Sequence, residues 1–355
     1  MRVELKLKRM DRVMSAWEIS KFLNKFNNKY YKIDLLNKIA TSSTEEDSEL
    51  FIMLNSFSLE NKYSYMKEEK FFLDKVSNLK KLYYLGIPIS INKNNVFFKE
   101  LGYYFYVIRS LNTKFHKYKV PKIKLEVLSE IYYFIQKYER NLIEIKKLNR
   151  ILIEIINKVC EENLKNFKIE SSKDEKDLIK LKREVTKILK NLNYNKIRKD
   201  FFDIFNKVER PVIGIYHKKD SSFEILCSYS ISPLITSSEK LDIKKIEHNS
   251  PTTIIAFMGG FSILFLIPLL KSIFISYNKK NIPLEEYQNN RKKLEEKLNE
   301  LEKISTKEDL EIIEKIKNIE LKTSLKNLQN YNIIEIEKLL KLNKMFENLE
   351  INIKE

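Results

Sequence analysis

One stretch of this 355-residue chain limits its possible folds more than any other: the 21 residues from Ser250 to Leu270 carry no charge. As a helix rising 1.5 Å per residue, the stretch would be about 31 Å long, close to the thickness of a bilayer core. It is apolar on every side, which does not suit a surface helix. We therefore predict a membrane helix over residues 250–276. Its apolar positions include Ile254, Phe257, Phe261, Leu264, Ile267 and Leu270.

Two other structures for the same stretch stay open. Gly259, Gly260 and Pro268 can interrupt a helix, so a re-entrant or interface-lying segment is one alternative. The other is a helix buried in a large domain. Lysines flank the stretch equally on both sides, so the positive-inside rule does not orient it. Because no apolar signal segment follows the first charged residues, we expect a single-pass protein of the cell membrane with a cytoplasmic N-terminal domain.

The predicted elements are mainly helical, which defines the expected fold class. Ser15 and Glu18 form a capping-box pattern that starts a helix to about residue 40. The segments Val212–His217 and Phe223–Ser230 predict a β-hairpin. The chain then divides into four expected units. They are a basic helical domain (1–210), a small β unit (211–249), the membrane helix (250–276) and a charged helical tail (277–355).

A second apolar pattern indicates helix association. Six residues recur at steps of three and four, close to the heptad seam of a coiled coil. They are Leu142, Ile145, Leu148, Leu152, Ile155 and Val159. Such a seam is covered by another helix of the same chain or by a second copy. We expect a homo-oligomer held partly by this seam and by the apolar stripe of the tail.

Charge points to an anionic partner. The chain has 66 Lys and Arg against 49 Asp and Glu, a net charge of +17. The first 210 residues hold +16 of it, which indicates a basic front half. Such a surface suits nucleic acid or anionic lipid. Only 10 of the 66 are Arg, however, and the abundant Lys, Ile and Asn also follow from AT-rich codons.

The sequence offers little catalytic chemistry. It has no glycine-rich phosphate loop and no HExxH, GxSxG or CxxC pattern, and its two Cys and three His predict no metal or cofactor. One element stands apart: Arg109 is followed after six residues by His116. It resembles the R-x(4–6)-H element of the HEPN ribonucleases. That resemblance implies a dimeric site in which His116 would move protons and Arg109 would hold developing charge on the phosphate.

The most consistent function is a membrane-anchored helical protein of interaction and assembly, without metabolic enzyme activity. Its layout resembles that of bacterial membrane-acting defence effectors, which implies a role in antiviral defence. Membrane lipid and a second copy of the chain are the expected partners. Two alternatives remain: a HEPN-like ribonuclease using Arg109 and His116, and a basic nucleic-acid-binding protein.

Overall fold

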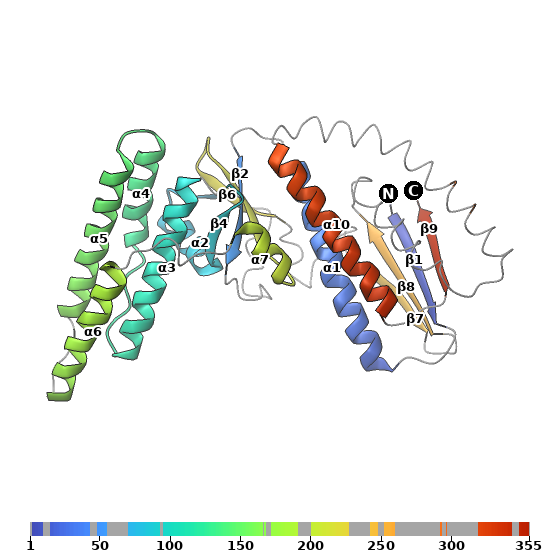
Figure 1. Ribbon diagram of the computed structural model, residues 1–355, viewed down its shortest axis with the longest axis horizontal. Coiled ribbons are helices and arrows are strands. Elements are labelled where there is room, and N and C mark those ends of the chain that lie inside the picture. The colour runs from blue at the N-terminus through green and yellow to red at the C-terminus, as the bar shows by residue number, and fades with distance from the viewer. Residues whose placement is uncertain are drawn as a thin grey trace.

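A computed structural model gives the fold of most of the chain (Figure 1). It describes residues 2–9, 15–42, 48–54, 70–92, 95–165, 167, 172–190, 200–226, 242–247, 252–259, 292, 296, 319–342 and 348–354. The described residues are mostly helical, as predicted, and they include two antiparallel sheets.

The first sheet has five short strands in the order β3-β6-β5-β2-β4. They are β2 (Ser48–Leu54), β3 (Phe71–Phe72), β4 (Ile87–Ser90), β5 (Ile213–His217) and β6 (Ser222–Ile225). The predicted hairpin is confirmed as β5 and β6, with Tyr216 opposite Phe223. A two-stranded hairpin is marginal alone, and β5 also pairs with β2, where Ile215 lies opposite Leu50. This sheet therefore takes strands from both sides of residue 210, where the sequence predicts a domain boundary.

Five helices lie on one side of this sheet (Figure 1). They are α2 (Val76–Leu85), α3 (Val96–Lys117), α4 (Val127–Glu139), α5 (Ile145–Lys165) and α6 (Ser172–Lys190). Helix α3 contacts β4, while α5 and α6 form an outer layer against α4 and α3 (Figure 1). Aromatic rings fill the contact between α3 and the sheet. Phe97 stacks on Tyr216 with ring centroids 4.7 Å apart, and Phe98 stacks on Phe51 at 4.8 Å. These rings form the centre of the hydrophobic core.

Helix α5 contains five of the six predicted seam residues and buries two of them, Leu148 and Leu152, fully within the chain. Its fully covered positions are Leu148, Leu152, Ile156 and Cys160, four residues apart, and they face α4 and α6. Ile155 and Val159 lie beside this line and are partly buried against the same core. Leu142 precedes the helix and is 64% exposed, while Ile145 is 36% exposed. The homo-oligomer remains a prediction that no contact described here tests.

The second sheet joins the two ends of the described chain. Its order is β7-β8-β1-β9, with β1 (Arg2–Arg9), β7 (Asp242–Glu247), β8 (Thr252–Gly259) and β9 (Asn348–Lys354). Leu5 of β1 pairs with Ala256 of β8 on one side and with Ile351 of β9 on the other. In the same register, Val3 and Leu7 of β1 pair with Ile353 and Leu349 of β9.

The prediction of a continuous helix over 250–276 is wrong for its first part. Residues 252–259, which include Ile254 and Phe257, form the strand β8 between β7 and β1. Thr252, Thr253, Ile254 and Ile255 are β-branched and favour a strand, and an interior strand can be uncharged throughout. Phe261, Leu264, Ile267 and Leu270 lie outside the described residues. No helix within the described ranges is both long enough and apolar enough to cross a membrane.

Helices α1 (Ala16–Ser42) and α10 (Ile319–Leu342) pack side by side between the two sheets (Figure 1). The predicted capping box is confirmed: the Glu18 amide donates to Ser15 Oγ at 3.2 Å, and the Ser15 amide donates to Glu18 Oε2 at 2.9 Å. The short helix α7 (Phe201–Lys207) lies against β2. The three helices α1, α7 and α10 surround the site described next.

Candidate functional site

A row of lysines follows one side of α1. Lys25, Lys29 and Lys32 are spaced by four and three residues, so they lie along one face of the helix. On α10, Glu335 and Lys338 face this row; Glu335 contacts Lys29. Lys25, Lys29, Lys338 and the α10 residue Leu339 line one pocket. Two segments about 300 residues apart in the sequence therefore build one wall of the site.

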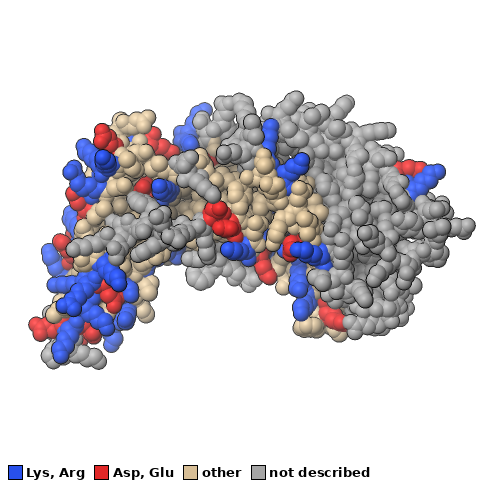
Figure 2. All heavy atoms as spheres, viewed as in Figure 1, with Lys and Arg blue, Asp and Glu red and all other residues tan. Residues whose placement is uncertain are grey.

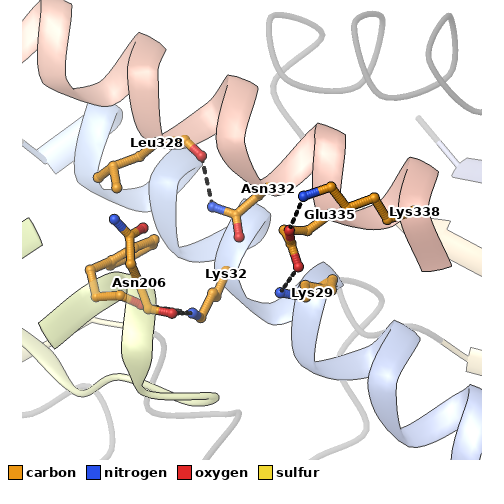
Figure 3. Close-up of polar contacts among 8 residues, drawn as sticks. Lys29, Lys32, Asn206, Leu328, Asn332, Glu335 and Lys338 are labelled. Carbon is orange, nitrogen blue, oxygen red and sulfur yellow. Dashed lines mark hydrogen bonds and ion pairs between the residues drawn. The ribbon is translucent and has the colours of Figure 1, made fainter. Parts of the chain in front are cut away.

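Lys32 occupies the inner end of this row and holds the end of α7. Its Nζ donates to the carbonyl oxygens of Phe205 at 2.7 Å and Asn206 at 3.0 Å (Figure 3). These carbonyls belong to the last turn of α7, where helical carbonyls lack partners of their own. The side chain is nearly enclosed, with 2% of its surface exposed. An ammonium has three donors, and two described carbonyls accept from Lys32, so a third N–H can serve a further acceptor.

The surroundings of Lys32 disfavour the protonated form of its amine. Burial, and then the nearby charge of Lys29, lower its pKa from 10.5 to about 8, although Glu209 and Glu335 act in the opposite direction. An additional anion beside the amine would offset that cost. The site therefore favours negative charge at the inner end of the row.

A carboxylate of the chain already stands between two lysines at the outer end. Glu335 contacts Lys29 at 3.5 Å and accepts from Lys338 at 3.0 Å (Figure 3). Burial alone would raise the pKa of Glu335, but the hydrogen bond from Lys338 and the charge of Lys29 together lower it. Glu335 is therefore a built-in anion held by cations from both helices.

Two amide side chains add unused hydrogen-bonding capacity. Asn332 is fully enclosed, and its Nδ2 donates to the Leu328 carbonyl at 2.8 Å (Figure 3). The Oδ1 atoms of Asn332 and Asn206 are buried, and neither has a hydrogen-bond partner among the described residues. Asn206 lines the pocket. Because an amide can turn to present its NH₂ group, Asn206 can serve a ligand as donor or acceptor.

These groups enclose a pocket of about 320 Å³ between α1, α7 and α10. Five lysines and two glutamates line it, so the lining is strongly cationic. Its residues are Lys25, Asn28, Lys29, Lys32, Asn206, Lys207, Glu209, Glu335, Lys338 and Leu339. Glu209 is engaged by Asn28, whose Nδ2 donates to its Oε2 at 3.0 Å. The arrangement is suited to binding an anion, because amines and amide groups are the donors that anions require.

The two residues of the HEPN-like element lie elsewhere, on α3. The Arg109 guanidinium lies 4.5 Å from the centre of the Tyr83 ring and donates from Nη2 to the Tyr83 carbonyl. His116 is near the end of the same helix and is exposed. A ribonuclease site would require both side chains to reach one phosphate, while Arg109 is engaged with α2. Among the described residues, no group of His, Cys, Asp and Glu could hold a metal ion.

Sequence reasoning missed the pocket because its lysines look like a solvated helix face. One signal was present: from Tyr30 to Leu36 the chain is apolar except for Lys32 and Asp34. A helix that is apolar on most sides is enclosed, so a charged residue inside such a run needs a specific partner. No known protein family, curated protein or solved structure matches this chain.

The lowered pKa of Lys32 gives a pH-dependent prediction. The pKa of Lys32 is about 8 in the folded chain, against the ordinary value of 10.5 that applies to the unfolded chain. Between these values the unfolded state binds more protons, so this residue's contribution to stability rises with pH. We compare the free energy of unfolding of the wild type with that of Lys32→Met. The wild-type value minus the variant value should increase with pH over this range, by at most about 1.4 kcal/mol per pH unit.

Urea unfolding of both proteins at about pH 7, 8, 9 and 10 measures this difference. Lys21→Met is the matched control, because Lys21 is exposed on the same helix. Its difference from the wild type should stay constant over the same range. A constant difference for Lys32→Met as well would show that Lys32 keeps an ordinary pKa.

Proposed function

We propose that this chain is a binding protein whose pocket between α1, α7 and α10 takes a small anion with phosphate or carboxylate groups. The observation that carries the proposal is the buried Lys32 side chain, which lines a pocket together with four further lysines. Lys32 is buried and the nearby charge of Lys29 opposes its charged form, while Lys25, Lys207 and Lys338 add exposed positive charge to the same pocket. Such a cluster is therefore better explained by a ligand of opposite charge than by stability.

The size of the pocket supports a small ligand. Pockets for small molecules span ~300–1,000 Å³, and this one has about 320 Å³. A molecule with one or two anionic groups would fill it. Lysine ammoniums act as point charges on phosphate or carboxylate and do not impose the planar geometry of arginine.

The contacts of Glu335 indicate where in the pocket the anionic group of a ligand would bind. Its carboxylate sits between Lys29 and Lys338, where an outside anion would gain the same two contacts. A ligand must therefore compete with Glu335 or bind beside it. Removing the charge of Glu335 without changing its shape should strengthen binding.

Isothermal titration of the full chain with sodium pyrophosphate and with citrate tests the proposal. We expect Lys29→Ala to weaken the binding of at least one probe by about tenfold or more, equal to about 1.4 kcal/mol. We expect Glu335→Gln to tighten binding, because it removes a competing anion.

Lys21→Ala is the matched control, since Lys21 is on α1 but not among the pocket residues. Its affinity should stay within about twofold of the wild type, since a single exposed charge is screened by salt. Absence of heat with both probes, or an equal loss in Lys21→Ala, would overturn the proposal.

The sequence-based hypotheses keep separate tests. An interaction protein without metabolic activity is compatible with ligand binding, and the pocket would supply its trigger. Membrane anchoring stays a proposal for residues 260–276, and carbonate extraction of membranes tests it. A HEPN-like ribonuclease stays a hypothesis whose test is RNA cleavage that His116→Ala abolishes.

A further inference from the structure

A second cationic surface lies far from the pocket, on α6. Lys176, Lys180, Arg183 and Lys187 are spaced by four, three and four residues, so they form one stripe along the helix. All four are exposed, as is Lys117 at the end of α3. We call these five residues the α6 basic patch. Figure 2 shows Lys and Arg side chains gathered at the end of the molecule where α6 lies.

Contacts between α3 and α6 hold the patch together. Lys114 of α3 pairs with Glu184 of α6 at 2.9 Å, and the Tyr118 hydroxyl donates to the same carboxylate at 3.3 Å. The Lys117 ammonium lies 5.3 Å from the centre of the Tyr118 ring. The end of α3 is thereby fixed beside the lysine stripe of α6.

The acidic residue at this junction does not neutralise the patch. The hydrogen bond from Lys114 lowers the pKa of Glu184, with further help from Lys117, so its charge is satisfied by α3. Asp177 lies near the Tyr118 hydroxyl, as does Lys180. None of the five patch residues has an ion-pair partner among the residues that the structure describes. Their charge is available to a partner.

The length of the stripe indicates an extended partner. From Lys176 to Lys187 the helix rises about 17 Å, at 1.5 Å per residue. Successive phosphates of one nucleic-acid strand advance about 3.4 Å along a duplex. The stripe therefore spans about five phosphates, which exceeds any small anion. An extended polyanion fits this surface better than a second metabolite.

The position of the apolar residues favours nucleic acid over a membrane. A helix that lies on a bilayer needs its apolar face free to enter the lipid. In α6 that face is already used, because Leu181 and Val185 are buried in the protein core. Ile179 is half exposed between Lys176 and Arg183, and it is a single apolar side chain among charged ones. The surface offers charge without an insertable apolar face.

We propose that the α6 basic patch binds the phosphate backbone of nucleic acid, without reading base sequence. Lysines and one arginine on a helix surface supply salt-dependent phosphate contacts. This proposal does not depend on the pocket ligand. The five residues of the patch lie along one side of α6 and at the adjoining end of α3.

Fluorescence anisotropy of the full chain with a labelled single-stranded RNA and a labelled DNA duplex, each about 20 nucleotides long, tests the proposal. We expect binding to at least one of them, with a salt slope for duplex DNA of about −3.6 if four phosphates are contacted. The double variant Arg183→Glu/Lys187→Glu should weaken binding by at least about tenfold.

The matched control is Lys146→Glu/Lys147→Glu, which changes the net charge equally at exposed positions near the start of α5. Its affinity should stay within about threefold of the wild type, because screening limits the reach of surface charge to about 10 Å. The proposal is overturned if neither nucleic acid binds, or if both double variants lose affinity equally. It is also overturned if the patch binds only vesicles of anionic lipid. Pyrophosphate binding in the pocket would be unaffected by any of these outcomes.

Discussion

Replacing Gly214 by alanine is expected to destabilise the fold, although alanine normally suits a strand better than glycine. Gly214 lies in β5 directly opposite Phe51 of β2. A Cβ atom at this position would lie 2.8 Å from Cε2 and 2.9 Å from Cε1 of the Phe51 ring. Real Cβ contacts are not that short, so the ring or the strand would have to move.

The Phe51 ring has little room to move. It is fully buried, stacks on Phe98 at 4.8 Å and meets Phe223 edge-on at 6.3 Å. Overpacking a core of this kind costs about 1–3 kcal/mol. We expect Gly214→Ala to lower the free energy of unfolding by about that amount. In a strand without the clash, the same change would stabilise the protein by roughly 0.5–1 kcal/mol.

A double-mutant cycle identifies the cause. Phe51→Leu keeps the site apolar but removes the ring atoms that the new Cβ would meet. If the clash is the reason, Gly214→Ala should cost less in the Phe51→Leu background, with a coupling of about 1 kcal/mol or more. Urea unfolding of the four proteins measures it. A stabilising effect of Gly214→Ala in the wild type would contradict this account.

Local signals predicted single elements well. The capping box at Ser15 fixes where α1 begins, because the hydroxyl and carboxylate satisfy amides within the same turn. The alternation of Val3, Leu5 and Leu7 with charged residues is typical of a strand or a mobile arm, and the structure has the strand β1 there. These signals depend on neighbours a few residues away, and a sequence displays such neighbours directly.

Partners distant in the sequence could not be predicted. Leu5 pairs with Ala256 and with Ile351, and no local pattern indicates either contact. The helix prediction was wrong over residues 252–259 for the same reason, because the strands that pair with this segment are distant in the sequence. A short uncharged run is equally typical of a buried helix and of an interior strand, and the choice here depends on β1 and β7.

The pocket was hidden for a related reason. Lys29 and Lys32 become a site only when α7 and α10 enclose them, and those helices lie about 170 and 300 residues further on. The anomaly of a lysine within an apolar helix was visible, but its partner was a pair of backbone carbonyls. Carbonyls are present in every residue, so no side-chain pattern can reveal them.

Aspartate at Leu148 or Leu152 is expected to unfold the helical part of the chain. Both side chains are fully buried between α4, α5 and α6. Each substitution removes a large apolar side chain and buries a carboxylate without a partner. The first effect alone costs about 2–5 kcal/mol, and the unpaired charge adds several more. Together they are comparable to the whole stability of a typical domain, about 5–15 kcal/mol.

Leu142→Asp is the informative comparison, because Leu142 belongs to the same heptad pattern but is 64% exposed. If the pattern serves only the fold of one chain, Leu142→Asp should change the free energy of unfolding by less than about 0.5 kcal/mol. Its mass in light scattering should also match that of the wild type. If a second copy covers the exposed end of the pattern, Leu142→Asp should lower the mass while the chain stays folded. Circular dichroism separates the two cases, because loss of helix in Leu148→Asp would mark unfolding, whereas dissociation would leave the helical signal unchanged.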